Sequence, residues 1–117
     1  MENRAKKLLF DVLTSGHSIR EWCSGRGFAE YEQDRQLRRA VEREFEIIGE
    51  ALGRLLQTDP VLAARIDELY RIVSFRNRII HGYDTIDDAA VWGVAEGDLP
   101  RLVAEVERLL QEAGEPQ

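Results

Sequence analysis

The apolar residues of segment 34–57 constrain the fold more than any other feature of the chain. They recur at intervals of three and four over more than five turns, at positions Leu37, Val41, Phe45, Ile48, Leu52 and Leu55. This spacing places all of them on one face of an α-helix. Asp59 and Pro60 follow and would stop the helix. We therefore predict one long amphipathic helix that buries a single face.

The apolar residues elsewhere also follow helical spacing, and no segment reads as a strand. We expect a first helix over residues 7–22, followed by the glycine-bearing connection SGRGF. Asp59 and Pro60 resemble the cap and first position of a short segment, which would run into a helix that ends at Gly82. Three or four long helices and one or two short ones predict an all-α, up-and-down four-helix-type bundle.

Two further helix boundaries are predicted after Gly82. Thr85 and Asp88 lie three residues apart and fit a capping box. Asp98 and Pro100 would open the last helix.

Length and composition fit one domain over residues 1–117, with 44% hydrophobic and 32% charged residues. No apolar run could span a membrane and no signal-peptide core begins the chain, so we expect a cytoplasmic protein without a membrane partner. A single cysteine and two histidines give no disulfide and no zinc-type ligand spacing. We therefore expect chemistry without a metal or a cofactor.

The charge pattern leaves two interpretations open. A net charge of −6 disfavours broad attraction to nucleic acid but allows a small basic cleft. Four arginines begin the long helix, interleaved with glutamates, and they form either a solvated face or a basic patch: Arg35, Arg38, Arg39 and Arg43. Gly49 and Gly53, four residues apart, predict a close helix approach within the bundle or in a dimer.

The segment RNRIIHGY, residues 76–83, carries most of the chemistry. The predicted buried stripe of its helix is Leu69, Ile72, Val73, Ile79, Ile80 and Tyr83. Arg76 falls in the middle of that stripe. A guanidinium there needs a carboxylate, a ligand or a crevice, because uncompensated burial of a charge is costly. Glu44 and Glu50 on the long helix are candidate supporting partners, although both could be solvated.

A plain helix C-terminus is the alternative explanation of this segment. Arg78 and His81 would complement the helix dipole, Gly82 would take a left-handed cap position, and Tyr83 would pack its ring. This alternative leaves Arg76 unexplained.

Further short elements accompany the motif. Arg76 and His81 enclose four residues beginning with Asn77, and Tyr83 follows one residue after His81. IGEA stands at residues 48–51, VW at 91–92 and LP at 99–100. Over nearly the whole chain, this pattern resembles the HEPN superfamily in its HepT-like toxin branch.

The resemblance implies a helical homodimer with two motif copies facing a shared cleft. It implies metal-independent RNA cleavage by the toxin of a toxin–antitoxin pair. The antitoxin would be a minimal nucleotidyltransferase that transfers AMP to Tyr83.

The residue types fit RNA cleavage without a metal. Histidine titrates near neutral pH, so His81 could move protons, and two copies would meet in a dimer. Arg76 offers a planar fork for phosphate oxygens, and Asn77 could orient the phosphate or the imidazole. In an unbroken helix Arg76 and His81 lie about 140° apart, so either the helix unwinds near Gly82 or the partner chain supplies one of them. We expect the latter.

Two other functions remain open. The chain could be a non-catalytic binding or presenting subunit of a two-component nucleotidyltransferase. It could also be a plain helical dimerisation module, which again leaves Arg76 unexplained.

Overall fold

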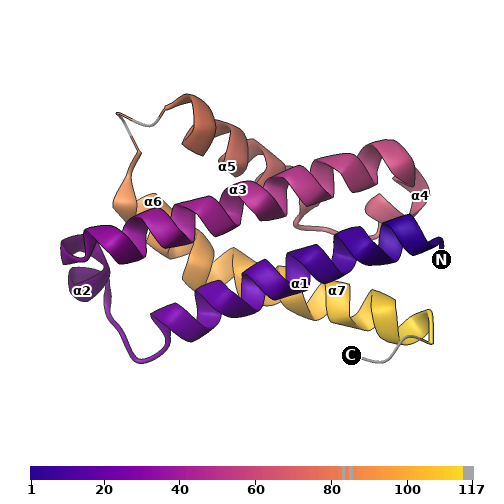
Figure 1. The fold of residues 1–117 in the computed structure, drawn as a ribbon, viewed down its shortest axis with the longest axis horizontal. Helices are drawn as coiled ribbons and strands as arrows, with labels where there is room; N and C mark the ends of the chain where they lie inside the picture. Colours follow the sequence, from indigo (N-terminus) through magenta and orange to yellow (C-terminus); the bar gives the residue numbers. More distant parts are fainter. Residues whose placement is uncertain (83, 85, 115–117) are drawn as a thin grey trace.

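The computed structural model describes residues 1–82, 84 and 86–114, and within these residues it contains helices and no strand (Figure 1). This confirms the predicted all-α class. No described helix has both the length and the apolar character needed to cross a membrane. The elements, in chain order, are α1 Asn3–Cys23, α2 Phe28–Gln33, α3 Arg35–Thr58, α4 Pro60–Ala63, α5 Leu69–His81, α6 Asp88–Gly93, the π-helical turn η1 Val94–Asp98 and α7 Leu99–Glu112.

The four longest helices pack in the order α5, α3, α1, α7. Neighbours in this row run in opposite directions, so α3 returns along α1 and α5 returns along α3 (Figure 1). The short helices α2 and α4 lie at opposite ends of α3. Helix α5 packs mainly on α3, which leaves its C-terminal end raised at the edge of the bundle near α6.

Helix α3 is the centre of the core, as its periodicity predicts. All six of its predicted apolar positions are buried. The Asp34 carboxylate accepts a hydrogen bond from the Leu37 N–H at 3.0 Å and fixes the start of the helix. The helix ends at Thr58, and Asp59 caps α4 by accepting from the Leu62 N–H at 3.0 Å.

The predicted buried face of α5 is wrong in part. Phe75 is buried and meets the Phe45 ring edge-on, with centroids 5.2 Å apart. Ile80 is 36% exposed and Val73 is only partly buried. Helix α5 is therefore rotated so that Phe75, and not Ile80, faces α3. Tyr83 lies outside the described residues.

The predicted start of α6 is also wrong. Asp87, not Thr85, caps α6, because its carboxylate accepts from Ala89 N at 2.9 Å and Ala90 N at 3.4 Å. Asp88 is thus the first residue of that helix rather than the third, and Thr85 lies outside the described residues.

The last helix begins at Leu99, directly after Asp98, as predicted, but Asp98 does not cap it. Asp98 has helical dihedral angles and no capping hydrogen bond, and α6, η1 and α7 form one continuous helical segment. In η1 the Leu99 N–H donates to the Val94 carbonyl, five residues back. We attribute the helix's tolerance of Pro100 to this widened turn, because proline lacks an N–H and its ring crowds the preceding turn.

One charged side chain of α3 is buried. Glu42 is 5% exposed and pairs with Arg39 at 3.1 Å, beside the buried Tyr31 ring that packs on Trp92 with centroids 5.3 Å apart. Burial raises the pKa of the Glu42 carboxyl above its ordinary value, and the Arg39 charge opposes that rise.

Replacing Glu42 by glutamine tests this burial. Because the folded-state pKa is raised, ionised Glu42 lowers the free energy of unfolding at pH values above that pKa. Glu42→Gln should raise the free energy of unfolding by ~1 kcal/mol at pH 7. The gain should vanish as the pH falls through the folded pKa to the ordinary glutamate value. Urea unfolding at several pH values measures it, with Glu46→Gln as the control; a gain independent of pH would contradict the assignment.

Candidate functional site

Arg76 lies between α5 and α3, directly over Gly49. The Arg76 side chain is half-buried. A Cβ added at Gly49 would overlap Cβ and Cγ of Arg76 and would lie 3.1 Å from its Cδ. Because Gly49 has no side chain, the aliphatic part of Arg76 packs directly against the α3 backbone at this position. This supports the predicted close approach within the bundle for Gly49. At Gly53 no described atom lies within 4 Å of an added Cβ.

The Arg76 guanidinium is held by an amide and not by a carboxylate. Its Nη1 donates to Asn77 Oδ1 at 3.0 Å, whereas its Nε is buried without a hydrogen-bond partner. It makes no ion pair with any described residue. An unpaired buried donor costs about 1–3 kcal/mol, more next to a full charge. The site thus retains an uncompensated cation with donors free for an anion.

The structure brings neither predicted supporting glutamate to Arg76. Glu50 is exposed and pairs with Arg54 one turn along α3, at 3.0 Å. Glu44 is partly buried and forms no ion pair within the described part of the chain. Both are better explained as surface residues of α3.

His81 is the last residue of α5, and its side chain is exposed. The helix is regular up to this point and is closed by the Gly82 N–H, which donates to the Arg78 carbonyl at 2.9 Å. Gly82 has φ −123°, so the left-handed cap that the alternative explanation places there is absent. Because α5 does not unwind before His81, Arg76 and His81 remain about 140° apart around the helix.

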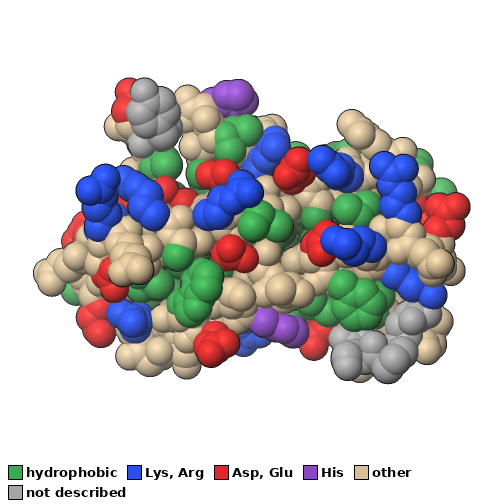
Figure 2. Space-filling model, viewed as in Figure 1, with side chains coloured by type: hydrophobic (Ala, Val, Ile, Leu, Met, Phe, Trp, Pro, Cys, Tyr) green, Lys and Arg blue, Asp and Glu red, His purple; other side chains and the backbone are tan. Residues whose placement is uncertain are grey.

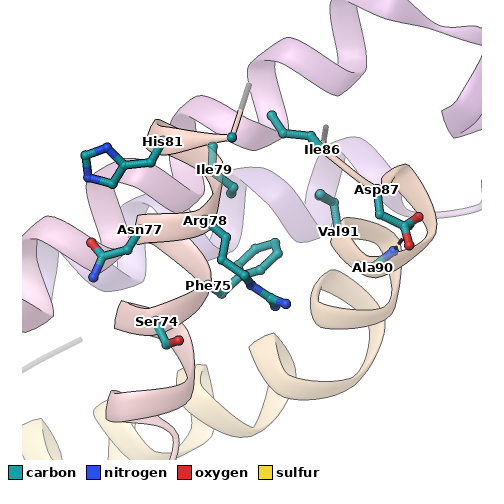
Figure 3. Close-up of a pocket in the computed structure, with 11 residues that line it drawn as sticks. Ser74, Phe75, Asn77, Arg78, Ile79, His81, Ile86, Asp87, Ala90 and Val91 are labelled. Carbon is teal, nitrogen blue, oxygen red and sulfur yellow. Dashed lines mark hydrogen bonds between the residues drawn. The ribbon is translucent and has the colours of Figure 1, made fainter. Parts of the chain in front are cut away.

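A cavity of about 510 Å³ lies between the C-terminal half of α5 and the start of α6 (Figure 3). Asn77 and His81 contribute to its rim, but Arg76 does not. Figure 3 shows the Asn77 and His81 side chains pointing to one side of α5, and Arg78 extending to the other, toward α6. The structure therefore gathers two of the three predicted catalytic residues at one opening and holds Arg76 on a different face.

Sequence reasoning missed the role of Arg78 and Phe75 in forming this cavity. The Arg78 guanidinium carbon lies 5.7 Å from the centroid of the Phe75 ring, which it covers. The two residues are three apart, a spacing that places them on one helical face and that could have indicated their contact.

Three of the four arginines at the start of α3 are paired with carboxylates rather than forming a basic patch, whereas Arg35 is exposed and makes no ion pair with a described residue. Arg39 pairs with Glu42 at 3.1 Å and Arg43 with Glu46 at 3.2 Å. Arg38 lies 3.7 Å from the Asp88 carboxylate. Figure 2 shows Lys and Arg side chains interspersed with Asp and Glu over the face formed by α1 and α3. The Arg76 guanidinium differs from these three arginines, because it has no carboxylate partner among the described residues.

Several known proteins are similar to this chain over most of its length. A family model described as "Ribonuclease HepT-like" matches residues 12–109. A Methanocaldococcus jannaschii protein provisionally named RNase MJ1380 is 32% identical over 102 residues, covering 87% of this chain and 93% of that protein. A Thermococcus cleftensis protein provisionally named ribonuclease HepT is 29% identical over 111 residues, covering 93% and 98%. No solved structure gives a significant match.

The match spans α3 with its IGEA element and α5 with the Arg76, Asn77 and His81 motif, so it covers the elements that build the site. It confirms the resemblance read from the motif. The chain therefore belongs to the HepT-like ribonuclease family, a branch of the HEPN superfamily.

Proposed function

We propose that the protein is a metal-independent ribonuclease whose active site joins Arg76, Asn77 and His81 across a homodimer. The observation that carries this proposal is the uncompensated Arg76 guanidinium, bedded on Gly49 and held by Asn77. Arg38, Arg39 and Arg43 of α3, by contrast, each have a carboxylate at 3.1–3.7 Å. An arginine kept half-buried without a carboxylate is suited to a phosphate that arrives with the substrate.

The reaction needs only these groups and the RNA itself. His81 removes the proton of the ribose 2′-hydroxyl, whose oxygen attacks phosphorus; the new O2′–P bond forms as the P–O5′ bond breaks. A second imidazole, from the partner's copy of His81, gives a proton to the leaving 5′-oxygen. The Arg76 fork stabilises the additional negative charge on the phosphate oxygens. Asn77 fixes the direction of that fork through its 3.0 Å hydrogen bond.

A dimer is proposed because one chain presents Arg76 and His81 on different faces of α5. Ile80 is 36% exposed and Val73 is only partly covered. These residues flank Arg76 and supply an apolar surface on which a second copy could lie. Light scattering at micromolar concentration should give the mass of a dimer, and a monomer would contradict the shared site.

The purified protein should cleave RNA in the presence of EDTA. No three His, Cys, Asp or Glu side chains gather in metal-binding geometry among the described residues, and the proposed steps use no metal. The same oligonucleotide with 2′-deoxyribose at the cleaved position should remain intact, because it lacks the attacking hydroxyl. Cleavage that stops in EDTA and returns with a divalent ion would contradict the mechanism. Gel analysis of end-labelled RNA distinguishes these outcomes.

We further propose that the chain is a toxin regulated at Tyr83, which lies outside the described residues. The partner would be a small nucleotidyltransferase antitoxin that transfers AMP from ATP to the tyrosine hydroxyl, with release of pyrophosphate. The added phosphate would compete with RNA for Arg76.

Mass spectrometry after co-expression with such an antitoxin should show a gain in AMP steps, absent in Tyr83→Phe. Tyr83→Phe should keep slowing growth when the antitoxin is present. If the antitoxin still neutralises this variant, binding and not AMP transfer is the mechanism. Modification of a protein that never cleaves RNA would instead support a presenting subunit of a nucleotidyltransferase.

A further inference from the structure

We propose that the cavity between α5 and α6 receives the base of a nucleotide next to the scissile phosphate, and that Arg78 holds this base. The inference rests on the proposed ribonuclease function and adds to it a site at which the substrate is bound.

The cavity has the size and walls of a ligand site. Its volume of about 510 Å³ falls within the range of about 300–1,000 Å³ typical of small-molecule sites. Ile79, Ile86 and Val91 give it an apolar wall, and Asn77 and His81 stand at its rim (Figure 3). A base bound inside would leave its own phosphate near His81.

Arg78 is the cation of this cavity and has no carboxylate partner among the described residues. Its guanidinium carbon lies over the Phe75 ring, 5.7 Å from the ring centroid, in a cation–π contact. The acid in the cavity wall, Asp87, is already engaged as the cap of α6 by the Ala89 and Ala90 N–H groups. Arg71 on the same helix differs, because it lies 3.7 Å from the Asp98 carboxylate.

A nucleobase fits these features together. Unpaired bases in single-stranded RNA stack on guanidinium planes and on aromatic or apolar side chains, and they hydrogen-bond through their edges. Arg78 offers its guanidinium as one surface and the apolar wall offers the second. The cavity borders the candidate catalytic residues, so the occupant is expected to belong to the same RNA strand.

The test measures binding of RNA that cannot be cleaved. Fully 2′-O-methylated oligonucleotides, each abasic at a different single position, are titrated by fluorescence anisotropy against four proteins. These are the wild type, Arg78→Ala, Ala90→Phe to fill the cavity, and Arg71→Ala as a control that removes the same charge from α5. Circular dichroism and thermal unfolding verify that each variant is folded.

One abasic position should weaken binding to the wild type by about tenfold, the scale of one stacked base. Arg78→Ala and Ala90→Phe should each bind the complete RNA with an affinity lower by a similar factor. With the RNA that is abasic at that position, the affinity of these variants should fall little further. Arg71→Ala should bind like the wild type.

Three results would overturn the proposal. The first is equal RNA affinity of Arg78→Ala and Arg71→Ala, and the second is that no single abasic position weakens binding. The third is that the affinity losses from Arg78→Ala and from the abasic site multiply when both changes are combined. RNA binding with these losses but without cleavage of unmodified RNA would overturn the ribonuclease function and keep the base subsite. An absence of both binding and cleavage would overturn both.

Discussion

Arg76→Ala and His81→Ala should each lower the rate constant of RNA cleavage by about 10²–10⁴-fold, the range expected for loss of a proton-transfer group or an oxyanion-type donor. Neither change should unfold the chain. His81 is exposed at the end of α5, and Arg76 forms no ion pair with a described residue. Single-turnover cleavage of a labelled RNA measures the effect. Full activity of His81→Ala would show that the assignment of His81 is incorrect.

A mixed dimer sharpens this prediction. If each site uses the His81 imidazoles of both chains, a dimer of one wild-type chain and one His81→Ala chain has no site with both proton-transfer groups. Heterodimers isolated through two different tags should then cleave RNA about as slowly as the His81→Ala homodimer, although one of the two chains is intact. A heterodimer with about half of the wild-type activity would show that each site uses a single His81.

Helix α3 was fully predictable from the sequence because its pattern runs over more than five turns with bounded ends. Any other rotation of the helix would bury charged residues, so only one face could pack on the core. All six apolar positions of that face are buried. Asp34 and Pro60 are chemical end signals that act within one turn. Local physics therefore sufficed for this helix.

The face of α5 was less predictable because its apolar residues cover a broad sector. Phe75 and Ile80 were both available for burial, and the choice depends on how α5 settles against α3 at Gly49. The distance between the two helices depends on both of them, so the pattern of α5 alone does not determine it. The same holds for the link between α6 and α7: the last helix begins after Asp98 as predicted, but it continues the helical segment of α6 and η1 without a break.

The candidate site was predictable as residue types but not as an arrangement. The motif identified Arg76, Asn77 and His81, yet the cavity that Asn77 and His81 border depends on where α6 begins. Its start was misread, so the contribution of Ile86 and Asp87 to one wall with Arg78 could not be foreseen. The free space beside Arg78 exists only in the tertiary structure.

The second large effect is expected at Gly49, whose lack of a side chain makes room for Arg76. A methyl group there would overlap Cβ and Cγ of Arg76, which lie close to the α5 backbone and cannot swing away as a flexible tip can. Gly49→Ala should therefore lower the free energy of unfolding by about 1–3 kcal/mol, the usual cost of overpacking, despite the better helix propensity of alanine. The same change should reduce RNA cleavage, because separating α3 from α5 moves the guanidinium relative to the partner chain.

Gly53→Ala is the matched control for this substitution. It lies one turn along α3, and no described atom stands within 4 Å of its added Cβ. Here only the backbone effect remains, so the free energy of unfolding should rise by about 0.5–1 kcal/mol. In an Arg76→Gly background, which removes both overlapping atoms, Gly49→Ala should lose most of its cost. Equal urea midpoints for Gly49→Ala and Gly53→Ala would show that Gly49 is not needed to accommodate Arg76. An unchanged loss of unfolding free energy from Gly49→Ala in that background would show the same.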